Sequence, residues 1–104
     1  MPFVILALDK PGSQALRQTL RPAHLDYLIA RQDMMLAGGA VLDDSGQAIG
    51  SLVIVDTQDA ATAQAFAGAD PFSEGQLFAS VQILPWRQAF LDRRHTPPRS
   101  ASNS

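Results

Sequence analysis

Near its start the chain reads FVILALDKPG at residues 3–12, a run of six apolar residues followed by a turn signal. A short, continuous apolar run of this kind is typical of a strand that is buried on both faces of a sheet. The Asp-Lys-Pro-Gly sequence that ends the run favours a turn. We therefore expect a central strand at residues 3–8.

After this turn, apolar residues recur at steps of three and four from residue 13 to residue 31, which predicts a helix. Pro22 interrupts the pattern, and proline is costly inside a helix but favourable in its first turn. We therefore expect two helical pieces, at about 13–20 and about 22–33, that meet at a kink.

The middle of the chain predicts a hairpin. Residues 34–42 are apolar and contain Gly38-Gly39, which permits a bulge or a bend in a strand. Residues 49–55 are rich in Val and Ile, which favours a third strand. The two segments are separated by the turn cluster at residues 43–46. We expect the second and third strands to pair across this turn.

The last part of the chain predicts a helix at residues 60–67, an irregular connection at 70–75 and a strand at 77–84. In this strand the side chains on one face are more apolar than those on the other face. Phe90 and Leu91 can add a short arm. From residue 93 to residue 104 almost no side chain is apolar, so this segment cannot bury enough surface to order itself. We predict one domain at residues 1–92 and a flexible tail at 93–104.

This order of elements predicts an α+β, ferredoxin-like βαββαβ fold with a four-stranded antiparallel sheet and both helices on one face. Apolar side chains occur on both faces of the first three strands, so the face without helices needs cover. A sheet from a second copy is the simplest cover, and we therefore expect a homodimer.

Composition excludes several classes of function. The chain has 104 residues and 46% hydrophobic content, enough for one core and too little for two ordinary domains. A net charge of −2 gives no electrostatic reason to expect nucleic acid or an anionic membrane as a partner. No apolar stretch approaches the roughly 20 residues that span a bilayer.

The chain has no cysteine, so disulfides, thiolate metal sites and a cysteine nucleophile are excluded. This composition fits the cytoplasm, where we expect the protein to be located. No glycine-rich phosphate-binding motif and no histidine pair at metal-ligand spacing occurs in the sequence. We therefore expect neither a cofactor nor a metal ion.

Several short segments point together to a known family. They are Arg21–Leu28 (RPAHLDYL), Gly38–Ala40 (GGA), Gly50-Ser51, Asp70–Phe72 (DPF), Leu77-Phe78 and Ile83–Trp86 (ILPW). In order and spacing they resemble the YciI-like, or YCII-related, proteins over about residues 2–90. The resemblance implies a dimeric ferredoxin-like α/β barrel, as in muconolactone isomerase-like proteins. It also implies that His24 and Asp70 form a catalytic pair. At least one member of the family is similar to a dehydrochlorinase that acts on a chlorinated hydroxyquinol.

The residues themselves are compatible with this chemistry. His24 falls in the first turn of the second predicted helical piece, on the side that faces the sheet. The positive end of a helix disfavours an imidazolium and a nearby carboxylate favours it, a balance that suits a general acid or base. Asp70 could orient the histidine and select its tautomer. The alternatives are a core histidine bonded to a backbone carbonyl and an ordinary turn aspartate.

Four further residues are candidates for ligand binding, each with a structural alternative. Ser51 could donate a hydrogen bond into a pocket, or serve only as a strand residue. Gly39 could leave room for a small ligand, or form a bulge. Arg21, with Arg17 and Arg31, could meet an anionic substrate, although a solvated helix face is the simpler interpretation. Phe72 could form a wall of the pocket, or belong to the core or the dimer contact.

Two functions remain open from the sequence. The first is a cofactor-free enzyme that uses a His24–Asp70 pair to move a proton on a small cyclic or aromatic organic acid or phenol, as an isomerase, lyase or dehydrochlorinase. The second is a non-catalytic dimeric protein that binds a small metabolite or assists another enzyme. A stable domain without an activity is a third, plainer interpretation.

Overall fold

The computed structural model describes residues 1–97 of the chain. Its elements, in chain order, are β1 (Phe3–Asp9), α1 (Gln14–Ala30), a single 3₁₀ turn (Gln32–Met34), β2 (Met35–Leu42), β3 (Ala48–Val55), α2 (Ala60–Gly68), α3 (Pro71–Glu74), β4 (Phe78–Pro85), β5 (Phe90–Leu91) and β6 (Arg94–His95).

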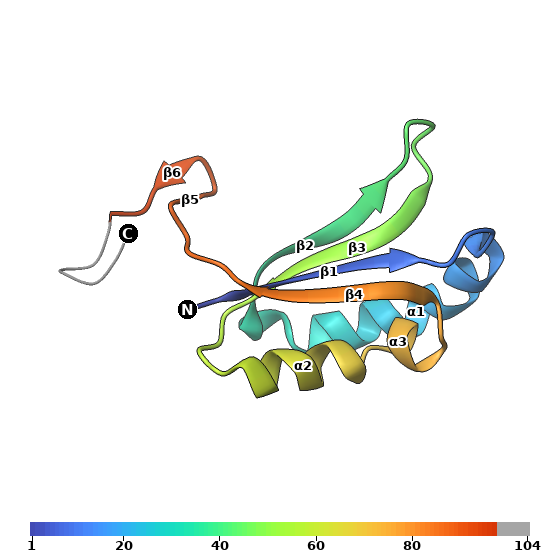
Figure 1. Cartoon of the computed structure of the whole chain (residues 1–104), viewed down its shortest axis with the longest axis horizontal. Helices are drawn as coiled ribbons and strands as arrows, with labels where there is room; N and C mark the ends of the chain where they lie inside the picture. The colour runs from blue at the N-terminus through green and yellow to red at the C-terminus, as the bar shows by residue number, and fades with distance from the viewer. Residues whose placement is uncertain (98–104) are drawn as a thin grey trace.

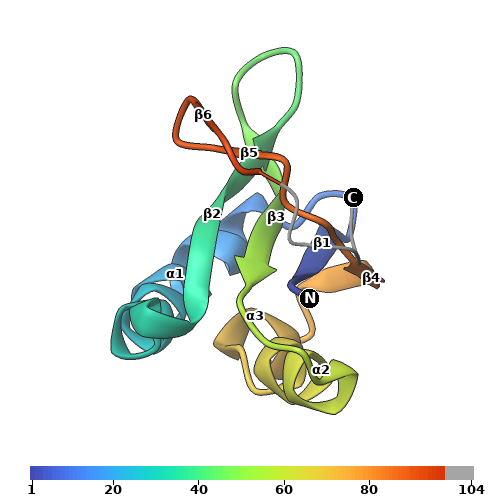
Figure 2. The same cartoon turned by 90° about the vertical axis from the view of Figure 1, so that its left-hand side faces the viewer.

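The four long strands form one antiparallel sheet in the order β2-β3-β1-β4, so β1 lies between β3 and β4. The helices α1, α2 and α3 cover one face of this sheet, and within residues 1–97 no helix covers the other (Figures 1 and 2). The predicted α+β, ferredoxin-like fold is confirmed, and with it the central position of the first strand. None of the described helices is both long enough and apolar enough to cross a bilayer.

The predicted break in the first helix is wrong. The helix α1 runs without interruption from Gln14 to Ala30 and contains Pro22. Proline at this position removes the hydrogen bond to the carbonyl oxygen of Gln18. Pro22 and Gln18 are both exposed, so water can bind that carbonyl group and the helix tolerates the missing bond.

The connection at residues 70–75, predicted to be irregular, contains the short helix α3. Asp70 has an extended backbone (φ −61°, ψ 131°), and its side chain accepts a hydrogen bond from the backbone N–H of Phe72. Pro71 occupies the first turn, where its fixed φ favours helix and its missing N–H costs nothing. The Asp-Pro pair therefore starts a helix here rather than an open turn.

The strand β2 is bulged, but not at its glycines. Gly38 and Gly39 pair regularly with Val53 and Leu52 on β3. The register shifts instead near the two ends of the strand, between Met35 and Ala37 and between Val41 and Leu42. The turn that joins β2 to β3 is held by Asp43, whose pKa is lowered chiefly by the hydrogen bond from the Ser45 hydroxyl group.

The hydrophobic core fills the space between the sheet and the helices. Phe72, Leu77 and Val55 are fully buried there. The opposite face of the sheet carries Leu8 and Leu84, which are exposed to solvent. One layer of helices therefore covers one side of the sheet, and the other side remains open in the single chain.

After β4 the chain leaves the sheet and forms a small hairpin of β5 and β6 (Figure 1). The backbone N–H of Trp86 donates to the carbonyl oxygen of Pro2 and fixes the start of this arm beside β1. Residues 98–104 of the predicted tail lie outside the described residues. The domain boundary at residue 92 stays a prediction.

Candidate active site

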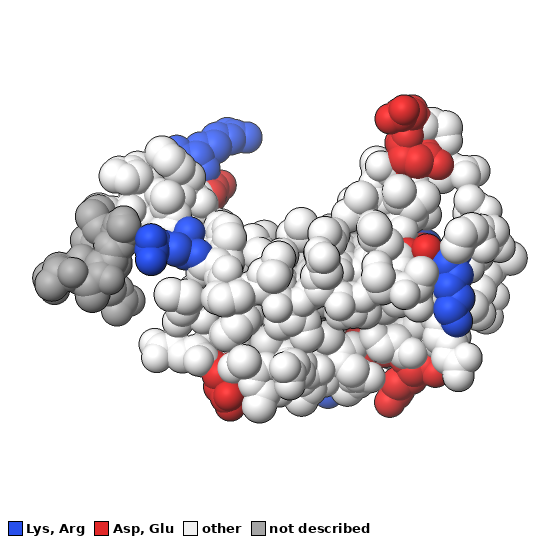
Figure 3. Space-filling model, in the orientation of Figure 1, with Lys and Arg blue, Asp and Glu red and all other residues white. Residues whose placement is uncertain are grey.

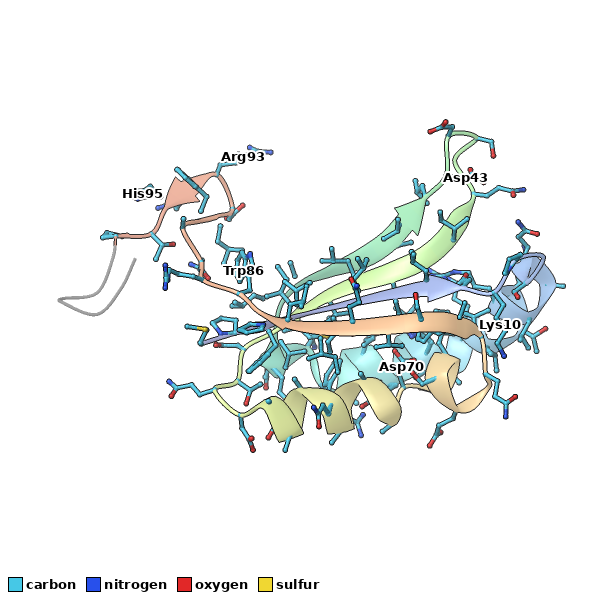
Figure 4. All side chains as sticks on the ribbon, in the orientation of Figure 1. Lys10, Asp43, Asp70, Trp86, Arg93 and His95 are labelled. Atoms are coloured by element: carbon cyan, nitrogen blue, oxygen red, sulfur yellow. The ribbon has the colours of Figure 1, made fainter. Side chains whose placement is uncertain are left out.

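His24 and Asp70 lie side by side although 46 positions separate them in the sequence. The ring atom Nδ1 of His24, on α1, is 2.8 Å from Oδ1 of Asp70, which caps α3. His24 is 9% exposed and Asp70 is 7% exposed, so both groups lie in the layer between sheet and helices. Figure 4 labels Asp70 in this layer, beneath β4.

The hydrogen bonds of Asp70 define the state of the histidine ring. Oδ1 accepts both from His24 and from the backbone N–H of Phe72, at 2.9 Å. A carboxylate without a hydrogen only accepts hydrogen bonds, so Nδ1 is the donor in this contact, and in the neutral ring Nε2 then presents a lone pair. Within residues 1–97 neither Nε2 nor Oδ2 has a hydrogen-bond partner, and neither is fully buried. One atom of each side chain is therefore free to exchange a proton.

Phe72 holds the imidazole in one plane. Its ring is fully buried and lies parallel to that of His24, with 3.7 Å between the ring centroids and 9° between the planes. Phe78, on β4, packs against Phe72 in a T-shaped arrangement, with 5.9 Å between the ring centroids. Because these aromatic contacts restrict the rotation of His24, the ring faces Asp70 in a fixed orientation.

A second polar cluster lies beside this pair. Arg17 is 8% exposed, and its Nη1 donates to both carboxylate oxygens of Asp9 at 2.7 and 2.9 Å. Its Nη2 donates to the carbonyl oxygen of Gly50 at 3.0 Å and to the hydroxyl oxygen of Ser51 at 3.1 Å. The guanidinium carbon is 4.7 Å from the centroid of the Phe72 ring. Arg17 is thus buried and paired, and its interpretation as part of a solvated helix face is wrong.

A small pocket opens between the sheet and the helices: the space inside it is about 20 Å³, and about 300 Å³ when its open mouth is included. Its polar residues are Ser51, Asp70 and Ser73; its apolar walls are Ile5, Ala7, Val53, Phe66, Ala67, Phe78 and Val81. His24 does not border this pocket itself and is connected to it through Asp70. The composition of the walls suits a small, largely apolar ligand that carries a few polar atoms, and a ring needs the walls to move apart because the inner space holds about one water.

The predicted ligand-binding residues divide into two groups. Ser51 borders the pocket, and Phe72 lies under the His24 ring rather than in the pocket wall. Arg21 is exposed on α1 and does not border the pocket. Gly39 lies on the opposite face of the sheet, since it pairs with Leu52, the neighbour of Ser51. The roles of Arg21 and Gly39 in ligand binding stay predictions.

Metal ligands do not gather in the described part of the chain. Among residues 1–97, no three His, Asp or Glu side chains lie close enough together to hold an ion. The other histidine, His95, lies in the arm and packs against Phe90, with 5.1 Å between the ring centroids. Figure 4 shows His95 at the far end of the molecule from the β2–β3 hairpin.

Comparison with known proteins identifies relatives across nearly the whole described chain. Residues 1–87 match the family model of the YCII-related domain. The protein YciI of Escherichia coli O6:H1 is 35% identical over 98 residues, which cover 86% of this chain and all of that protein. A protein of Haemophilus influenzae is 29% identical with the same coverage of both chains.

A solved structure is similar in both sequence and fold. It is that of 5-chloro-2-hydroxyhydroquinone dehydrochlorinase from Burkholderia phenoliruptrix, in complex with 2,5-dihydroxybenzoquinone. The TM-score is 0.77 at 31% sequence identity, and the match covers 84% of this chain and 94% of the dehydrochlorinase. With these relatives and the matching family model, the chain belongs to the family of proteins with a YCII-related domain.

Proposed function

We propose that this protein is a cofactor-free enzyme that moves a proton on a small hydroxylated ring, with His24 and Asp70 as its acid–base pair. The observation that carries the proposal is the 2.8 Å contact between a buried imidazole and a buried carboxylate at the wall of an apolar pocket. A pair of this kind is suited to general acid–base catalysis, because it can take up a proton and return it.

Each member of the pair has a separate role in this proposal. Asp70 fixes the tautomer and the orientation of His24 and stabilises the positive charge that forms when the ring takes a proton. The pair can hold that proton at Nε2 of His24 or at Oδ2 of Asp70, the two atoms without a hydrogen-bond partner in residues 1–97. The apolar walls hold the ring and exclude water, which strengthens the interaction of charges in the pocket.

The solved relative indicates the class of substrate. That protein is a dehydrochlorinase of a chlorinated, hydroxylated ring and was crystallised with a ring that carries four oxygen atoms. The loss of HCl from a trihydroxylated chlorobenzene yields a hydroxyquinone and needs no external oxidant, because only a proton and chloride leave. Chemistry of this kind requires a group that accepts a proton, which the His24–Asp70 pair supplies in our proposal.

Chloride release from 5-chloro-2-hydroxyhydroquinone tests the proposal. The assay is run without oxygen, because such rings oxidise in air, and compares the wild type with His24→Asn and His95→Asn. General acid–base catalysis contributes roughly 10²- to 10⁴-fold, so we expect His24→Asn to lower kcat/KM at least about 100-fold. His95→Asn removes the other histidine of the chain and should retain the wild-type rate. Equal rates for all three proteins would contradict catalysis and favour a non-catalytic binding protein.

The proposed active form is a homodimer in which two sheets meet face to face as an α/β barrel. The open sheet face carries exposed leucines, and burying such a face is favourable. Figure 3 shows charged residues on the arm, at the hairpin end and along the lower edge where the helices lie, while the surface between the arm and the hairpin is largely uncharged. The proposed location is the cytoplasm, a prediction that is supported by the cysteine-free sequence.

A further inference from the structure

We propose that Asp9, Arg17 and Ser51 form a hydrogen-bond relay that presents the Ser51 hydroxyl group to an ionised oxygen of the ligand. This inference rests on the proposed function and deepens it, because it assigns the second half of the site. The His24–Asp70 pair would accept a proton from one position of the ligand ring, and Ser51 would bind an oxygen at another position. Asp9 and Arg17 act through Ser51 and are positioning residues.

The bonding of Ser51 leaves one hydrogen without an acceptor. A serine hydroxyl group can donate one hydrogen bond and accept two. Arg17 donates to the hydroxyl oxygen at 3.1 Å, and within residues 1–97 the hydroxyl hydrogen has no acceptor. Ser51 is 6% exposed and borders the pocket. Since a buried donor is rarely left unsatisfied, an oxygen atom inside the pocket is its expected acceptor.

Arg17 makes this hydroxyl group a stronger donor. A hydrogen bond that an oxygen accepts from a cation polarises its own O–H bond, and chains of such bonds strengthen one another in a buried environment. Asp9 sits at the far side of the guanidinium, at 2.7 and 2.9 Å, so the ion pair is a dipole whose positive end meets Ser51. The positive end of this dipole favours an anionic oxygen over a neutral one.

The position of Arg17 is fixed on several sides. Besides Asp9 and Ser51, the guanidinium donates to the carbonyl oxygen of Gly50 at 3.0 Å and lies over the ring of Phe72. Phe72 contacts His24 through its ring, so one buried aromatic residue supports both polar clusters. A pre-oriented donor of this kind loses little entropy when a ligand binds, which is the property that a specificity-determining site requires.

The arrangement of polar groups in the pocket specifies the ligand more narrowly than the class of hydroxylated rings. The pocket has a donor at Ser51 and an acceptor at Asp70, and its remaining walls are mainly apolar. A ring with one ionised oxygen, which accepts from Ser51, and a second group that can give up a proton to the His24–Asp70 pair matches both polar positions. A site built to bind an oxygen rejects analogues that lack it, because its buried donor is then left unpaired.

The experiment measures how tightly 2,5-dihydroxybenzoquinone binds across the pH range in which this probe ionises, by calorimetry. The variants are Ser51→Ala, Ser51→Thr, Arg17→Lys and Thr19→Ala. The last is a matched control, because Thr19 does not border the pocket and its hydroxyl group donates to the carbonyl oxygen of Ala15 at 3.0 Å. We expect the wild type to bind more tightly as the probe ionises.

For Ser51→Ala we expect roughly 10- to 100-fold weaker binding of the ionised probe, the effect of losing a hydrogen bond to a charged group. Its affinity should also depend less on pH, and Arg17→Lys should show the same change. Ser51→Thr keeps the hydroxyl group and Thr19→Ala loses one outside the pocket, so both should retain the wild-type pH dependence. A general loss of structure would not separate the variants in this way.

Two results would overturn the relay. One is a Ser51→Ala variant whose affinity and pH dependence match those of the wild type, and the other is a wild type that binds the probe at no pH. The proposed catalysis fails on a different result, equal chloride release by the wild type and His24→Asn. A relay without catalysis, or catalysis without the relay, would therefore be recognised as such.

Discussion

Replacement of Asp70 by two different residues separates the structural contribution of this carboxylate from its chemical one. Asp70→Asn keeps a side-chain oxygen that can accept from the backbone N–H of Phe72 and from Nδ1 of His24. Asparagine is as good as aspartate at the N-cap of a helix. We therefore expect Asp70→Asn to lower the free energy of unfolding by no more than about 1 kcal/mol.

Asp70→Ala removes both hydrogen bonds. Loss of a helix cap costs about 1 kcal/mol, and a buried donor without an acceptor, here Nδ1 of His24, costs about 1–3 kcal/mol more. We expect a total loss of about 2–4 kcal/mol in the free energy of unfolding, allowing that the two contributions are coupled. For a domain of this size the loss lowers Tm by roughly 10–25 °C.

Urea unfolding followed by far-ultraviolet circular dichroism measures both variants. It is carried out at two protein concentrations, because association of the proposed dimer would make the measured stability depend on concentration. The anaerobic chloride assay is then applied to Asp70→Asn, which should fold but lose at least about 100-fold in kcat/KM, since a neutral amide does not stabilise the positive charge that forms on the His24 ring. If Asp70→Asn were as unstable as Asp70→Ala, the capping argument would be refuted. If it turned over at the wild-type rate, the carboxylate would have no catalytic role.

Further predictions concern stability and assembly. Gly50→Ala should lower the free energy of unfolding by about 1–3 kcal/mol, because the new Cβ would lie 2.5 Å from a carbonyl oxygen of β1. Gly39→Ala, whose Cβ would meet nothing within 4 Å, should unfold at nearly the wild-type urea concentration. Leu84→Asp, at a residue 51% exposed on the open sheet face, should shift the mass measured by light scattering from dimer to monomer. Ile29→Asp, at a residue 53% exposed on α1, should leave the measured mass unchanged. Burial raises the pKa of Tyr27 above its ordinary value of 10.0, so its contribution to stability is complete below pH 10 and falls as the pH rises through the raised pKa. Tyr27→Phe should weaken this alkaline dependence in urea unfolding measured from pH 9 to 12.

The strands were predictable from the sequence because their signals are local. The apolar run at residues 3–8 and the Val- and Ile-rich segment at 49–55 lie within β1 and β3, with boundaries that differ by one residue. The order of elements then left few topologies to consider. The break predicted at Pro22 gave too much weight to propensity, which the packing of a 17-residue helix on the sheet overrides.

Two features of the site were missed for different reasons. The helix α3 had a readable signal, since aspartate followed by proline is a typical helix start. The burial of Arg17 had only a weak signal in the sequence. Arg17 lies seven positions before His24, so the two side chains fall on the same side of α1. Its partner Asp9 follows from no spacing rule, because a pair that forms between a strand end and a helix depends on how the two pack. The 2.8 Å contact of His24 with Asp70 likewise depends on the three-dimensional fold.

A crystal structure of the protein soaked with 2,5-dihydroxybenzoquinone tests the central proposal most directly. We expect the ring to lie in the pocket between β1, β3 and the helices, with one oxygen within hydrogen-bond distance of the Ser51 hydroxyl group and another within reach of the His24–Asp70 pair. A ring bound elsewhere, or an oxygen pattern that leaves Ser51 and both members of the pair without contact, would contradict the proposal.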